Sequence, residues 1–232
     1  MKWSEFFTSS VGKKFIMSLT GISLILFLIV HVGLNACIFN ATGENSDHGE
    51  MFNRAAYFMG STVVPRLLEV ALFIGIFLHA IQGLVLEIQN RSKRGVKYQV
   101  NYGNRGSTWY SRSMGLLGTL ILIFLIVHWT QFWIPSRFLG VEEVSYDGKP
   151  MHNLFALMKV TFTEPWVIVL YVLGCISLAY HLMHGFQSAF RTMGLRNHKH
   201  IRLIRGAGIA FSVIVPLAFA MMPISMYFDW VA

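Results

Sequence analysis

Five apolar runs, each about as long as a bilayer is thick, dominate this sequence of 232 residues. A bilayer core of about 30 Å requires about 20 apolar residues in a helix. The runs lie at approximately 14–39, 64–88, 113–134, 165–190 and 203–227. With 54% hydrophobic and only 13% charged residues, the chain has too little polar surface to cover a soluble core. The sequence therefore predicts an all-α integral membrane protein, with residues 1–232 forming one domain of five transmembrane helices.

The formal net charge of +8 would favour a nucleic-acid partner in a soluble protein. Here the Lys and Arg residues lie in short clusters between the apolar runs, a pattern that sets membrane topology, so no nucleic-acid partner is expected. The two cysteines, Cys37 and Cys175, lie in no CxxC or CxxCH context, which argues against an iron–sulfur cluster and covalently attached haem c. The first run has no small-residue cleavage site, so it is expected to be a retained span.

The distribution of charge predicts the orientation. The N-terminal segment and the second and fourth connections hold 14 of the 19 Lys and Arg residues. The first and third connections carry most of the acids, which are Glu44, Asp47, Glu50, Glu142, Glu143, Asp147 and Glu164. By the positive-inside rule, the N-terminus is cytoplasmic and the C-terminus lies outside.

Five of the nine histidines lie inside the apolar runs: His31, His79, His128, His181 and His184. An ionisable side chain in hydrocarbon is costly and normally faces the bundle interior with a partner. For one such histidine, the simplest interpretation is a hydrogen bond between helices. Four different helices each contributing a histidine indicate a shared function.

The depths of these histidines form two levels. At 1.5 Å per residue, His31 and His128 lie roughly 25 Å from the cytoplasmic cations, and His79 and His181 lie roughly 15–18 Å from them. Two pairs at matched depth are what two bis-histidine haems stacked across a membrane require. His184 follows His181 by three residues on nearly the same helix face, and only one of the two can share an iron with His79. The other could bind a haem propionate or a quinone carbonyl, or relay a proton.

Several short motifs occur in a characteristic order along the chain. They are Ser18-Leu19-Thr20-Gly21 with His31 thirteen residues after the serine, Leu68-Glu69 with His79 ten residues after the glutamate, His128 on the third run, and His181-Leu182-Met183-His184-Gly185 on the fourth. In this set the chain resembles the cytochrome b subunits of succinate:quinone oxidoreductases, in the five-helix, di-haem class that includes quinol:fumarate reductases. The resemblance covers essentially the whole chain.

The resemblance implies a role for each histidine. It makes His79 and His181 the ligands of the proximal haem b, nearer the cytoplasm, and His31 and His128 the ligands of the distal haem b, in agreement with the pairing by depth. The family often has another polar residue at the position of His184, which favours His181 as the ligand.

The resemblance also implies contacts with the haem propionates. Ser18 corresponds to a small polar residue placed to bond a proximal propionate. Four residues near the same surface could neutralise the carboxylates: Arg91, Trp109, Arg112 and Arg191. The alternative for the arginines is that they only enforce topology.

Partners also follow from the resemblance. The subunit would anchor a flavoprotein bearing FAD and an iron–sulfur subunit at the inner (cytoplasmic) membrane, and would exchange electrons with a membrane quinone such as menaquinone. We expect the basic connections 91–112 and 191–205 to form the docking surface. A quinone site near the distal haem is expected, with Glu69, Glu50 and Arg54 as candidates for proton transfer, the last two as outer-loop residues. Glu69 could instead simply bind a neighbouring helix.

Three other functions are compatible with intramembrane histidines. A cytochrome b subunit of a membrane hydrogenase or formate dehydrogenase would assign the ligands to other helices. A histidine-using proton or metal transporter would carry more carboxylates and broken helices at mid-membrane. A haem-free anchor would use the histidines for hydrogen bonds alone. A visible absorption spectrum of the purified protein, oxidised and reduced, distinguishes the haem-binding classes from the other two.

The asymmetry of Lys and Arg leads to a prediction about topology. A reporter fused after Asp229 is expected to report the non-cytoplasmic side, because 14 of the 19 cations belong to the opposite face. A cytoplasmic signal would show that the number of spans is not five.

Overall fold

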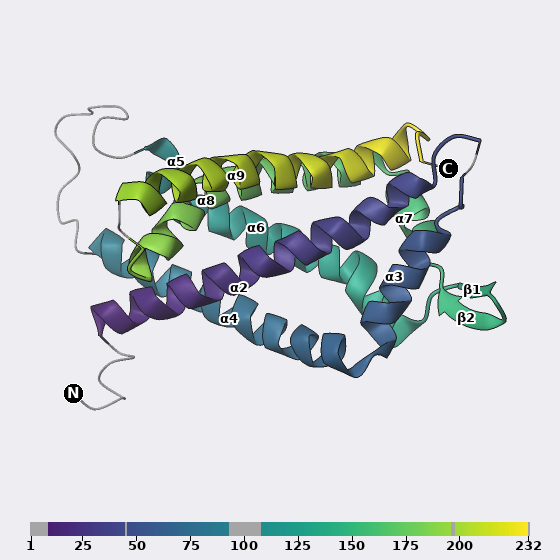
Figure 1. The fold of residues 1–232 in the computed structure, drawn as a ribbon, viewed down its shortest axis with the longest axis horizontal. Helices are drawn as coiled ribbons and strands as arrows, with labels where there is room; N and C mark the ends of the chain where they lie inside the picture. The colour runs from purple at the N-terminus through teal and green to yellow at the C-terminus, as the bar shows by residue number, and fades with distance from the viewer. Residues whose placement is uncertain (1–8, 45, 93–107, 196–197, 232) are drawn as a thin grey trace. The chain divides into compact units, whose positions relative to one another are not determined.

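The computed structural model describes residues 9–44, 46–92, 108–195 and 198–231, with the backbone alone at 198 and 199. Within these ranges, five helical segments are long and apolar enough to cross a membrane, as the sequence predicted (Figure 1). The helices concerned are α2 (Ser10–Ala36), α4 (Val63–Ser92), α6 (Met114–His128), α8 (Pro165–Thr192) and α9 (His198–Tyr227). A 3-10 turn, Cys37–Asn40, extends α2. The chain is therefore a multi-pass membrane protein.

The third span is longer than predicted. The sequence places its end at about Ile134, but helical turns continue to Leu139. After α6 the chain widens into two π-helical segments, Trp129–Trp133 and Pro135–Leu139. Pro135 begins the second segment, where its missing N–H costs little. The extension brings Arg137 into the span, and π-helical turns are frequent at functional sites.

The connections contain secondary structure that the all-α prediction omitted. The helix α3 (Glu50–Ser61) follows the first span. The strands β1 (Glu143–Tyr146) and β2 (Lys149–His152) form an antiparallel hairpin after the third span, and α7 (Leu154–Thr161) follows them. Asp147 and Gly148 form the two-residue turn with positive φ at both, as a type I′ turn requires. A short helix, α5 (Trp109–Arg112), precedes α6.

The chain divides into two compact units. Each of the five spanning helices contributes residues to both units. Unit 1 comprises Met1–Phe27, Ala71–Leu120 and Ser177–Val213. In it, Gly208 of α9 faces Phe186 of α8, and an added Cβ would lie 2.8 Å from the ring. This glycine therefore permits close packing of α8 and α9.

Unit 2 comprises Leu28–Val70, Ile121–Ile176 and Ile214–Ala232. Its core contains side chains from all its segments, with Ile38, Phe155, Val167 and Met222 among the most buried. The helix α3 lies beside α7 and the hairpin, so these short elements pack as one group within the unit (Figure 1).

The N-terminus of α3 is held by the carboxylate of Asp47. It accepts hydrogen bonds from the backbone N–H groups of Gly49 and Met51, at 3.0 and 2.9 Å, and from the amide of Asn40 at 2.8 Å. Burial raises the pKa of Asp47, but these hydrogen bonds outweigh burial and hold the pKa below its ordinary value. A carboxylate here also complements the helix dipole.

Asn53 joins α3 to the hairpin and to α7. Its amide nitrogen donates to the Tyr146 hydroxyl and to Asn153 Oδ1, both at 3.1 Å, and its oxygen accepts from the Phe155 N–H at 3.0 Å. Its side chain is only 1% exposed. If Asn53 were replaced, its hydrogen-bond partners would therefore have little access to water.

Replacing Asn53 by Ala is expected to lower the free energy of unfolding by about 1–3 kcal/mol, because buried partners lose their hydrogen bonds. Thermal unfolding of the detergent-solubilised protein measures this loss. Asn40→Ala is the matched control, since Asn40 is exposed and its amide donates to the Asp47 carboxylate. Equal losses for the two variants would contradict a central role for Asn53.

Candidate functional site

In unit 1 the rings of His79 on α4 and His181 on α8 face each other. Their centroids are 6.1 Å apart and their planes are inclined at 65°. The described ring contacts of His79 include His181 but not His184. The structure thus brings together the pair that the sequence placed at one depth.

Thr20 fixes the orientation of the His79 ring. Its hydroxyl lies 3.1 Å from His79 Nδ1 and donates to the carbonyl oxygen of Ile16 at 2.9 Å. A second backbone carbonyl, that of Met17, lies 3.2 Å from the same hydroxyl, and with the hydroxyl proton on either carbonyl the oxygen accepts from the imidazole. Nδ1 then carries the proton, and the lone pair of Nε2 is available to a metal.

The other ring of this pair lacks such an anchor. His181 Nδ1 is buried and has no hydrogen-bond partner among the residues that the structure describes. Glycines lie beside both rings: a Cβ added at Gly21 would be 3.6 Å from His79, and one added at Gly118 would be 3.8 Å from His181. Small residues therefore line both imidazoles.

In unit 2 the rings of His31 on α2 and His128 at the end of α6 form a second pair. Their centroids are 5.9 Å apart and their planes are inclined at 82°. His128 Nδ1 lies 3.2 Å from the Tyr171 hydroxyl, which donates to Gln131 Oε1 at 2.7 Å. The tyrosine oxygen must therefore accept from His128, which again leaves the Nε2 lone pair available.

His31 has a different contact. The amide nitrogen of Asn35 donates to the His31 carbonyl oxygen at 2.8 Å and lies 3.3 Å from His31 Nδ1. An amide nitrogen is a donor, so in this arrangement Nδ1 is the acceptor. The ring also packs against Phe219 at 5.4 Å.

Both pairs fit the axial ligands of a haem. A metal–imidazole bond is about 2 Å long, so two imidazoles that held one metal ion between them would have ring centres about 6 Å apart. The two observed separations, 5.9 and 6.1 Å, match this value. In the described parts of the chain, no three His, Cys, Asp or Glu side chains gather as metal ligands. Two donors suit a porphyrin, which supplies four nitrogens itself.

Two of the predicted propionate contacts have partners within unit 1. The Ser18 hydroxyl is buried and donates to the Ala189 carbonyl oxygen at 2.6 Å, so it joins α2 to α8. Arg91 is exposed and donates to Glu87, one turn earlier, at 2.6 Å.

The other predicted residues of this group lie near the helix ends. The Trp109 ring contacts the Tyr180 ring edge-on at 5.4 Å. Arg112 and Arg191 are exposed. Most of the predicted docking connection, residues 93–107, lies outside the described residues, as do 196 and 197.

At one end of α4, the Glu69 carboxylate forms a cluster with Arg137 and Trp133, which the sequence had not connected with it. Glu69 Oε2 accepts from Arg137 Nη2 at 2.9 Å, and Oε1 accepts from Arg137 Nε at 3.2 Å and from Trp133 Nε1 at 2.5 Å. The side chains of Glu69 and Arg137 are only 21% and 23% exposed. The sequence prediction ended the third span at about Ile134 and did not connect Arg137 with Glu69.

Glu50 and Arg54 lie on α3 and not in a loop, because α3 begins at Glu50. Arg54 donates to Glu50 at 2.6 Å and to Asp147 at 2.6 Å, and its guanidinium lies over the Tyr146 ring. Both hydrogen bonds raise the pKa of Arg54, and the bond to Asp147 has the larger effect. The arginine thus has a structural role in joining α3 to the hairpin.

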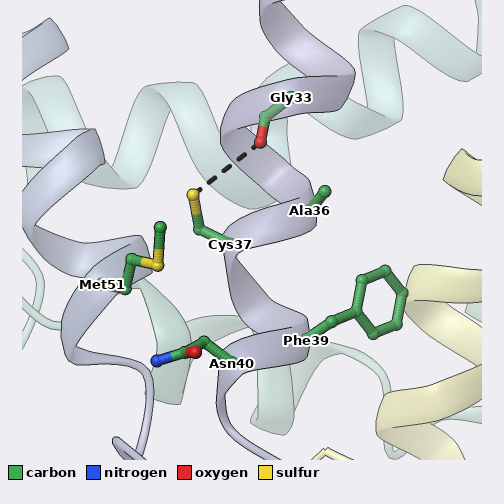
Figure 2. A pocket seen from close by; sticks show the side chains of 6 residues that line it. All are labelled: Gly33, Ala36, Cys37, Phe39, Asn40 and Met51. Carbon is green, nitrogen blue, oxygen red and sulfur yellow. Dashed lines mark hydrogen bonds between the residues drawn. The ribbon is translucent and has the colours of Figure 1, made fainter.

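A hollow of about 370 Å³ lies where α2 ends and α3 begins. Figure 2 shows the six residues that line it, Gly33, Ala36, Cys37, Phe39, Asn40 and Met51. The Cys37 thiol donates weakly to the Gly33 carbonyl oxygen at 3.8 Å (Figure 2). None of the six is a predicted ligand or proton carrier, so the hollow is separate from the predicted redox residues.

The five spanning helices define a multi-pass membrane protein in which histidines from four helices form two pairs. The chain is similar to the succinate dehydrogenase cytochrome b558 subunit of Bacillus subtilis (strain 168), with 27% identity over 171 residues, which is 73% of each chain. This similarity confirms the resemblance to cytochrome b subunits of succinate dehydrogenase. Neither a protein-family model nor a solved structure matches the chain.

Proposed function

We propose that this chain is the di-haem cytochrome b subunit that anchors a succinate:quinone oxidoreductase in the cytoplasmic membrane. In this function it passes electrons between an iron–sulfur subunit, itself joined to an FAD-bearing flavoprotein, and a membrane quinone such as menaquinone. The observation that carries the proposal is the presence of two facing histidine pairs on four spanning helices. The similarity to a succinate dehydrogenase cytochrome b558 subunit supports it.

Each histidine pair would hold one haem b. His79 and His181 are assigned to the proximal haem, and His31 and His128 to the distal haem. Haem b bound in this way supplies reversible one-electron chemistry at its iron. Thr20 and Tyr171 keep the Nε2 lone pairs of His79 and His128 available for ligation. His184, three residues beyond His181, is assigned to a propionate, a quinone carbonyl or a proton relay.

The Glu69 cluster is the candidate quinone site. Reduction of a quinone to a quinol takes up two electrons and two protons, so the site needs a group that exchanges protons near the quinone oxygens. Glu69 carries such a group, and Arg137 and Trp133 orient its carboxylate through three hydrogen bonds. Glu69 lies on the spanning helix α4, whereas Glu50 and Arg54 lie on α3, outside the spans, which favours Glu69 as the proton-exchanging residue.

The histidine assignments predict three classes of variant. Replacing His31 or His128 should remove or disturb one haem, and replacing His79 or His181 should affect the other, because each loss leaves an iron with one axial ligand. His184→Gln should keep both haems six-coordinate and shift a potential or slow quinone turnover. The measurements are haem content per chain, redox titration and electron spin resonance of each variant.

Two results would contradict these assignments. One is the loss of the same spectral component in the His31 and His79 variants. The other is the loss of the proximal haem in His184→Gln while His181→Gln retains it. The absence of b-type absorption from the purified wild-type protein would contradict the function itself.

Glu69→Gln is expected to reduce quinone turnover at least tenfold while both haems remain, because the amide keeps the shape of the side chain and loses its exchangeable proton. Steady-state quinone reduction by the assembled complex measures this effect, and the absorption spectrum measures haem content.

Glu87→Gln is the matched control, because Glu87 is also a glutamate of α4 that is paired with an arginine. It is expected to retain most of the turnover. A pattern in which Glu87→Gln inactivates the complex and Glu69→Gln does not would move the proton-exchanging site away from Glu69.

A further inference from the structure

Tyr171 is held firmly in the core of unit 2. Its side chain is 6% exposed, and its ring meets Phe124 and Phe162 edge-on, with both pairs of centroids 5.0 Å apart. The packing fixes the position of the phenolic oxygen, since a Tyr ring has only two torsions to set. That oxygen lies between His128 Nδ1 and Gln131 Oε1.

The direction of these two hydrogen bonds follows from the number of protons. A phenol has one proton, and the 2.7 Å bond to the amide oxygen of Gln131 uses it. Toward His128 the phenol oxygen can then only accept, so the imidazole is the donor. Gln131 thereby determines, through Tyr171, which nitrogen of His128 carries hydrogen.

Thr20 has the same relation to His79 in unit 1, with a backbone carbonyl in place of the glutamine. Its hydroxyl donates to the backbone carbonyls of Ile16 at 2.9 Å or Met17 at 3.2 Å, which leaves the oxygen to accept from His79 at 3.1 Å. The two pairs are thus anchored by different acceptors. His128 has the phenol of Tyr171, and His79 has the aliphatic hydroxyl of Thr20.

We propose that Tyr171, with Gln131 as its acceptor, is the positioning residue of His128, that Thr20 is the positioning residue of His79, and that each sets the potential of its own haem. The proposal rests on the proposed function, in which these histidines are axial ligands. A ligand imidazole that donates from Nδ1 has more electron density at Nε2 and stabilises the oxidised iron. Removing the acceptor therefore raises the midpoint potential of that haem alone.

Tyr171→Phe tests this most directly, because it removes one oxygen atom and keeps the packed ring. In the complex with its partner subunits, haem content is expected to stay at the wild-type level. The spectral component that is lost in His128 variants should titrate at a higher potential and change its electron spin resonance signal. The other component should stay unchanged.

Tyr180→Phe is the matched control on the same helix, since phenylalanine keeps the ring contacts with Trp109 and Tyr110, and the described ring contacts of Tyr180 include no candidate iron ligand. It should move neither potential. Thr20→Val should raise the potential of the component that is lost in His79 variants, and Thr20→Ser should restore it. Should Tyr171→Phe fail to assemble, Gln131→Leu provides the second measurement, with the same component expected to shift.

The proposal is overturned if Tyr171→Phe and Gln131→Leu bind both haems with wild-type potentials, or if Tyr171→Phe and Thr20→Val shift the same component. These outcomes leave the proposed function intact, because haem is still bound. A wild-type protein without haem would instead overturn the proposed function and this inference together.

Discussion

The structure depends on the cost of placing imidazoles in hydrocarbon. The membrane offers no water to a polar side chain, so each buried histidine must find its partner within the protein. Three of the four central histidines meet this requirement through Nδ1, whereas His181 Nδ1 has no hydrogen-bond partner among the residues that the structure describes. Each of the four rings also faces another imidazole about 6 Å away. The surrounding helices are positioned to allow both contacts.

This constraint explains what the sequence could predict. The spans follow from apolar length, because lipid imposes one length on every helix that crosses it. The pairing of His79 with His181 followed from the fixed rise per residue, without knowledge of any contact. The connections were less predictable, because α3 and the hairpin lie outside the lipid, where length carries no such information. The helical turns beyond Ile134 were not predicted, because the apolar run that defined the span stops there, whereas Pro135 begins a new π-helical turn.

The positioning residues could not be predicted for another reason. Thr20 lies 59 residues from His79, and Tyr171 lies 43 residues from His128. Each hydroxyl has several potential partners. Whether it donates to the histidine or accepts from it depends on the position of a third group that can take the hydroxyl proton. For Tyr171 that group is Gln131, which only the fold brings near. Sequence spacing gives the depth of a ligand, but the proton on its ring is determined by contacts between helices.

The two histidines of the unit 2 pair, His31 and His128, differ in which ring nitrogen carries the proton. His31 Nδ1 faces the amide nitrogen of Asn35, which favours hydrogen on Nε2, whereas an axial ligand uses the Nε2 lone pair. Ligation by His31 requires the proton to lie on Nδ1 and the Asn35 amide to turn its oxygen toward the ring. That rotation gives up the 2.8 Å bond to the His31 carbonyl, a net cost of about 1 kcal/mol. His128, already anchored by Tyr171, needs no such change. His128 is therefore better prepared than His31 to hold a haem iron, because its Nε2 lone pair is already available.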